Sequence, residues 1–102
     1  MPAKKVRSMS QYWGVGRLGT HQSAAYTGTA GTITNAISAG VKKARIATTS
    51  ASYIKIGVAP TATTSDVYMP ADAAEYLTVA PGEKVSAIQV SGAGTLHVTE
   101  IP

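Results

Sequence analysis

Short segments in which apolar and polar residues alternate run through the second half of the chain, and turn-forming residues separate them. In "SYIKIGV", for example, Ile54, Ile56 and Val58 fall on one side of an extended chain. A side-chain period of two is that of a β-strand with one buried face. Such segments recur about every 8–12 residues, which is the spacing typical of a β-sandwich or a small barrel.

These patterns predict an all-β fold, a small antiparallel β-sandwich that is jelly-roll-like or barrel-like. We place this single domain at residues 33–102, with tight hairpins at "ATTSAS" (47–52) and "SGAG" (91–94). In "APGEK", Pro81 and Gly82 suit the central positions of a type II turn. The predicted core consists of the inward positions of the strands: Ile46, Ile54, Ile56, Val58, Leu77, Val79, Val85, Leu96 and Val98.

Residues 1–32 show no clear periodicity, and we predict an extended N-terminal arm there, with at most one short strand around Ala24–Thr29. Few large apolar groups are available to offset the entropy of ordering it, so we expect the arm to order only on contact with a neighbouring subunit. Its candidate partner-binding residues combine cations with aromatic anchors: Lys4, Lys5, Arg7, Tyr12, Trp13 and Arg17.

Charge is divided unevenly along the chain. Residues 1–65 carry eight cations and no acid, whereas residues 66–102 carry five acids and one cation, Lys84. This division favours head-to-tail association or docking on an acidic partner, unless the fold interleaves the two parts and the charges even out. We expect a homo-oligomer, because a small domain with a thin core often gains stability from a partner.

Few residues could carry chemistry. The chain has no cysteine, which excludes disulfides and thiolate metal sites. "GVGRLG" resembles a phosphate-binding loop, but no strand precedes it and no helix follows. Asp66, Asp72 and Glu75 surround a proline-bounded loop, where we interpret them as solvated, and His97 as a surface or interface residue. We therefore expect no enzyme activity, no cofactor and no metal, and no membrane passage, since neither a signal peptide nor a run of about 20 apolar residues is present.

Nucleic acid is a further partner to weigh. Cations around Tyr12 and Trp13 form the mixture that single-strand binders use, yet four phosphate contacts give only a weak grip. The cations of "VKKARI" fall on both faces of one strand, so only part of that cluster can meet one ligand. We therefore favour protein docking over nucleic-acid binding for the arm.

Residues 45–101 contain, in order, the motifs "YIKIG", "PTAT", "YMPA", "YLTVAPGEKVSAIQV" and "GTLHVTE". On these motifs the segment resembles a group of small bacteriophage virion structural proteins, and the arm lies outside the resemblance. It implies a β-sandwich that decorates or cements the exterior of the capsid, assembled in the host cytoplasm, with the major capsid protein or neighbouring virion subunits as partners. By analogy with decoration proteins at three-fold axes, the expected oligomer is a trimer. A head-fibre base, a tail or neck component, and a nucleic-acid- or carbohydrate-binding module remain alternatives.

The arm yields a prediction. If Trp13 anchors the arm in an apolar niche of a neighbour, Trp13→Ala weakens binding to particles stripped of this protein by about 2 kcal/mol, a factor of about 30. Neutralising Lys4 and Lys5 mainly changes salt sensitivity and association rate. The nucleic-acid alternative predicts instead that neutralising the cations is the more damaging change. Undiminished particle binding after deletion of the arm would contradict both accounts of the arm.

Overall fold

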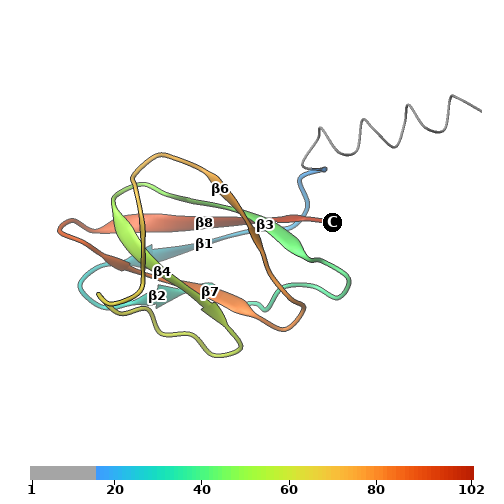
Figure 1. Ribbon diagram of the computed structural model, residues 1–102, viewed down its shortest axis with the longest axis horizontal. Helices are drawn as coiled ribbons and strands as arrows, with labels where there is room; N and C mark the ends of the chain where they lie inside the picture. The colour runs from blue at the N-terminus through green and yellow to red at the C-terminus, as the bar shows by residue number, and fades with distance from the viewer. Residues whose placement is uncertain (1–15) are drawn as a thin grey trace, which may run out of the picture.

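A computed structural model describes residues 16–102, and it contains eight β-strands arranged as two facing antiparallel sheets (Figure 1). The strands are β1 (His21–Tyr26), β2 (Gly31–Thr32), β3 (Lys43–Thr48), β4 (Ser52–Gly57), β5 (Val67–Met69), β6 (Glu75–Thr78), β7 (Lys84–Gln89) and β8 (Gly94–Ile101). The predicted all-β sandwich is confirmed. Residues 16–102 hold no helix long and apolar enough to cross a membrane.

The strand order is that of a ribbon folded in half and then wrapped. β1 pairs with β8, β2 with β7, β3 with β6 and β4 with β5, all antiparallel. Wrapping places β8 beside β3 and β7 beside β4. The first sheet thus has the order β1-β8-β3-β6 and the second β2-β7-β4-β5, which together make a jelly roll.

Both predicted hairpins are wrong. β3 belongs to the first sheet and β4 to the second, so residues 49–51 carry the chain from one sheet to the other, and the link from β7 to β8 does the same. Of all consecutive strands in the described part, only β4 and β5 are neighbours within one sheet. The type II turn is present: Gly82 has φ 89° and the Glu83 N–H donates to Ala80 O over 3.1 Å.

The predicted arm boundary also needs correction. β1 and β2 are integral strands, since all six residues of β1 pair with β8. Two further backbone bonds, from Gly19 N to Glu100 O and from Glu100 N to Thr20 O, extend this pairing toward residue 19. The short strand predicted around Ala24–Thr29 overlaps β1 at Ala24–Tyr26, but backbone pairing with β8 extends the strand back to His21. The expectation of an extended arm is therefore wrong for residues 21–32, and residues 1–15 lie outside the described part.

The core lies between the two sheets. Six of the nine predicted core residues are buried, while Ile56 and Leu77 are partly buried. Val58 is 75% exposed, because β4 ends at Gly57 and the alternation stops with it. The core also includes buried residues outside the alternating segments: Tyr26, Ile33, Ile37, Val41 and Met69.

Tyr26 connects the end of β1 to the link between β3 and β4. Its side chain is 1% exposed, and its hydroxyl donates to Ser50 O over 2.6 Å while the Ser50 N–H donates back over 3.3 Å. A Cβ at Gly94 would lie 2.6 Å from the Tyr26 hydroxyl oxygen, so β8 needs glycine at its first residue. The tyrosine thus holds the crossing loop in place with both its ring and its hydroxyl.

The edge at which β1 meets β2 yields a stability prediction. A Cβ at Gly31 would lie 1.9 Å from Ala25 O, a backbone atom that cannot swing aside. Gly31→Ala should therefore lower the free energy of unfolding by about 1–3 kcal/mol in urea denaturation, as overpacking does elsewhere. Gly57→Ala is the matched control, because no atom lies within 4 Å of its added Cβ. Equal effects from the two substitutions would show that β1 does not constrain Gly31.

Candidate functional site

An apolar groove opens between the edge strands β5 and β6, one from each sheet. Its volume is about 300 Å³, and its lining consists of Ile54, Ile56, Val67, Tyr68, Met69, Glu75 and Leu77. The groove exists because β5 and β6 end their respective sheets and neither strand exceeds four residues. Strand edges with unpaired backbone groups are ready to pair with another chain. We call this feature the β5–β6 groove.

Large apolar side chains project beside the groove. Val67 is 74% exposed and Tyr68 is 55% exposed, although both belong to a strand. Tyr68 meets Tyr53 of the adjacent strand edge to face, with ring centroids 6.2 Å apart. Contiguous exposed apolar surface of this kind marks protein-binding sites more often than scattered single residues do.

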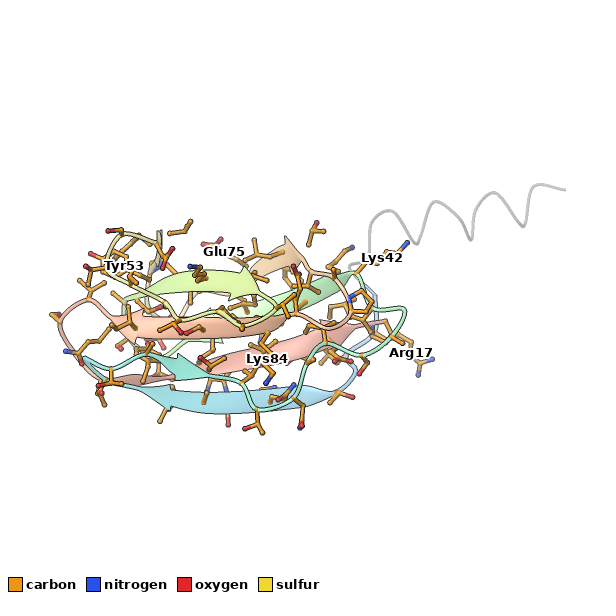
Figure 2. The ribbon with its side chains drawn as sticks, turned by 90° about the horizontal axis from the view of Figure 1, so that it is seen from below. Arg17, Lys42, Tyr53, Glu75 and Lys84 are labelled. Atoms are coloured by element: carbon orange, nitrogen blue, oxygen red, sulfur yellow. The ribbon has the colours of Figure 1, made fainter. Side chains whose placement is uncertain are left out.

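Three of the chain's five acids lie along the β5–β6 side of the sandwich. Asp66 immediately precedes β5, Asp72 lies between the two strands, and Glu75 begins β6 and lines the groove. One carboxylate oxygen of Asp66 already has a partner in its own loop, because it accepts the Thr63 N–H over 2.7 Å. The cations Arg17 and Lys42 lie together at one end of the sandwich, away from Tyr53 (Figure 2). The fold nevertheless interleaves the basic and acidic parts of the chain, since β3, which carries Lys43 and Arg45, pairs with both β6 and β8.

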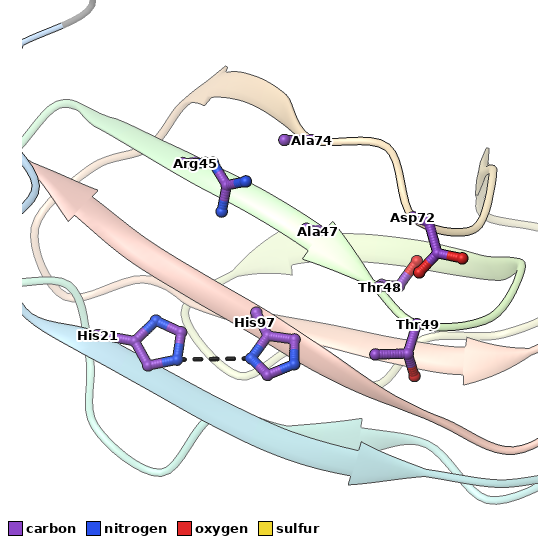
Figure 3. Close-up of a pocket in the computed structure, with 8 residues that line it drawn as sticks. All are labelled: His21, Arg45, Ala47, Thr48, Thr49, Asp72, Ala74 and His97. Carbon is purple, nitrogen blue, oxygen red and sulfur yellow. Dashed lines mark hydrogen bonds between the residues drawn. The ribbon is translucent and has the colours of Figure 1, made fainter.

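A second feature, which we call the histidine hollow, lies on the outer face of the first sheet (Figure 3). β6 pairs with β3 only as far as Ile46↔Glu75, so the last residues of β3 have no strand neighbour on that side. The loop before β6 closes over the gap, and the Asp72 N–H donates to Thr48 O over 2.8 Å. The resulting hollow has a volume of about 330 Å³. Its lining comes from β1, β3, β8 and this loop: His21, Arg45, Ala47, Thr48, Thr49, Asp72, Ala74 and His97.

Two stacked histidines form one wall of the hollow. The rings of His21 and His97 lie 5.5 Å apart between centroids and 19° from parallel. His21 Nδ1 is 2.9 Å from Thr99 Oγ1, and His21 Nε2 is 3.5 Å from His97 Nδ1. These contacts form a chain of polar atoms that fixes both rings on the sheet. The two histidines are 76 residues apart in sequence and meet because β1 pairs with β8.

Two features beside the hollow, one in the loop before β6 and one at the end of β3, are energetically unfavourable in the free protein. Asp72 has φ 57°, the left-handed region that residues other than glycine adopt uncommonly. Thr48 is 2% exposed, and its hydroxyl oxygen has no hydrogen-bond partner. Strained backbone and unsatisfied buried polar groups occur disproportionately at functional sites.

Of the six predicted partner-binding residues, one lies in the described part of the chain. Lys4, Lys5, Arg7, Tyr12 and Trp13 lie outside the described residues, and Arg17 is exposed just before β1. Sequence reasoning interpreted Asp72 and Glu75 as solvated, and both are exposed; the fold adds that Asp72 lines the hollow and Glu75 the groove. It missed both features, because each is built from residues that only the strand order brings together.

Comparisons of the chain with protein-family models, curated proteins and solved structures found no match. Within residues 16–102, no group of three or more His, Cys, Asp or Glu side chains is placed to hold a metal ion. The β5–β6 groove and the histidine hollow are therefore the features from which function is argued.

The unpartnered Thr48 hydroxyl, on the core-facing side of β3, generates a prediction. Thr48→Val removes a buried polar group at nearly constant shape, so it should raise the free energy of unfolding by about 1 kcal/mol. Thr99→Val is the matched control on β8, and it should lower that free energy by about 1 kcal/mol because it breaks the contact with His21. Urea denaturation measures both. A destabilising Thr48→Val would mean that its hydroxyl has a partner in solution.

Proposed function

We propose that this protein is a non-enzymatic structural protein of a bacteriophage virion, which binds the capsid exterior as a decoration or cement protein. The resemblance of residues 45–101 to small virion structural proteins supports this, and so does the jelly-roll strand order, an architecture that viral capsid domains use. Its partners are the major capsid protein and neighbouring copies of the chain.

The β5–β6 groove is the observation that carries the proposal. A domain that worked alone would gain by covering Val67 and Tyr68, since exposed apolar strand edges invite association. A subunit of an assembly needs such an edge. Added strands at sheet edges gain affinity from main-chain hydrogen bonds and specificity from pockets for alternate side chains.

The occupant of the groove is the N-terminal segment of a neighbouring copy, residues 1–15. That segment carries Lys4, Lys5 and Arg7 with no acid, while Glu75 lines the groove and Asp66 directly precedes β5. Its Tyr12 and Trp13 are the apolar anchors that a hydrophobic groove accepts. Fifteen extended residues span up to about 50 Å, enough to reach the next subunit. Such a head-to-tail contact uses two different surfaces, so it forms a ring when the rotation between subunits closes, and the proposed trimer is one such ring.

A matched pair of valines tests this interface. Val67→Lys places a cation in the groove side, where it repels the basic segment and breaks an apolar contact. Val58→Lys is the control, because Val58 is 75% exposed against 74% for Val67 and does not line the groove. Light scattering should show that Val67→Lys weakens self-association at least tenfold while Val58→Lys leaves it unchanged.

Two outcomes contradict parts of the proposal separately. Equal oligomers for both variants, or an unchanged oligomer after removal of residues 1–15, would exclude the groove as the subunit contact. Mass spectrometry of purified virions tests the function itself. The protein should be present in a fixed ratio to the major capsid protein, and its absence from particles would overturn the decoration role whatever the oligomer is.

A further inference from the structure

We infer that the histidine hollow is a binding site for a neutral saccharide unit, a function separate from the docking proposed for the β5–β6 groove. The hollow lies on the outer face of the first sheet, whereas the groove opens at the sandwich edge, so the two can be occupied together.

The shape of the hollow follows from side-chain size along β3. Arg45, Ala47 and Thr49 point outward in succession, and the small Ala47 leaves a floor between two polar ends. His97 pairs with Ala47 across the sheet and forms one wall, and Ala74 contributes a second small surface opposite (Figure 3). A volume of about 330 Å³ lies within the range of small-ligand sites, about 300–1,000 Å³.

The chemistry of the walls matches a ligand rich in hydroxyl groups. Arg45 can only donate hydrogen bonds, the Asp72 carboxylate can only accept them, and the hydroxyl of Thr49 can do both. Each hydroxyl of a sugar also donates and accepts, so one ring can satisfy donors on one side and acceptors on the other. The stacked histidines present a flat, fixed wall with further ring nitrogens.

The loop that carries Asp72 is held at the rim of the hollow. The Asp72 N–H donates to Thr48 O over 2.8 Å and Asp72 adopts φ 57°, so backbone pairing with β3 positions its carboxylate. Asp72 and Arg45 line the same hollow. One hydroxyl of a ligand can therefore donate to Asp72 while another accepts from Arg45.

Other ligand classes fit less well. A simple anion would be attracted by Arg45 but repelled by the Asp72 carboxylate. A cation would be attracted by Asp72 but repelled by Arg45. An apolar ligand would leave the arginine, the aspartate and Thr49 without water or partners. Within residues 16–102, no three His, Cys, Asp or Glu side chains are placed to hold a metal ion.

The test uses the full chain and a panel of methyl glycosides of common hexoses and N-acetylhexosamines, followed by amide NMR titration. At least one glycoside should shift the amides of residues 45–49, 72–74 and 97, with a dissociation constant in the millimolar range. Arg45→Ala should weaken that binding at least tenfold. Lys55→Ala, which removes an exposed cation from the outer face of the second sheet, should leave it unchanged.

Two further variants guard against misfolding as an explanation. Ala47→Met fills the floor and should abolish binding. Asp72→Gly removes the carboxylate yet tolerates the positive φ, so it should weaken binding while the amide spectrum keeps its dispersion. The inference is overturned if no glycoside shifts these amides, if inorganic phosphate shifts them and the glycosides do not, or if Ala47→Met binds as the wild type does.

Discussion

The pairing of β3 with β8 is the contact on which the rest of the structure depends. Six residue pairs, from Lys43↔Ile101 to Thr48↔Leu96, join the middle of the chain to its end. The pairings of β1 with β8, β2 with β7, β3 with β6 and β4 with β5 alone would make one long two-stranded antiparallel ribbon. The β3–β8 ladder curls this ribbon, so that the two sheets face one another. The same ladder sets His97 beside Ala47 and Thr99 beside Arg45, so the outer-face hollow and the inner core share one cause. Loop closure over some fifty residues opposes this contact, and the buried Ile46, Leu96 and Val98 beneath it offset that cost.

Sequence reasoning located strands where one face is buried and failed where the reason for a strand lies elsewhere. The segments that became β3, β4, β6, β7 and β8 alternate because their inner residues meet the core. In β1 only Tyr26 is a large buried side chain; the other residues are small or polar, so the alternation carries little hydrophobic signal and backbone pairing with β8 positions the strand. The residues at 49–51 and 91–93 are turn formers, but a turn that crosses between sheets has the same composition as a hairpin. Val58 continues the alternation of β4 by coincidence after the strand has ended.

The two candidate sites could not be predicted from the sequence, for a related reason. His21, Arg45, Asp72 and His97 come from four separate parts of the chain, and nothing local marks any of them as partners. The brevity of β6 shapes both sites: it leaves the end of β3 uncovered on one side and leaves the core accessible on the other. The segment from this loop to the start of β6 therefore borders both sites, with Asp72 of the loop in the hollow and Glu75 of β6 in the groove. Of the sequence-based site residues, only Arg17 lies in the described part, and it is exposed outside both features.

The adjacency of β1 and β8 gives the molecule a polarity. Gly16 lies against Ile101 and Pro102, so the described chain begins and ends at the same pole (Figure 1). The links at 49–51 and 91–93 lie at the opposite pole, where Gly92 has no atom within 4 Å of an added Cβ. On a particle held through residues near the first pole, the second faces the medium. A peptide inserted at Gly92 would then be displayed outward at every copy, whereas a tag fused to Pro102 would lie toward the surface beneath.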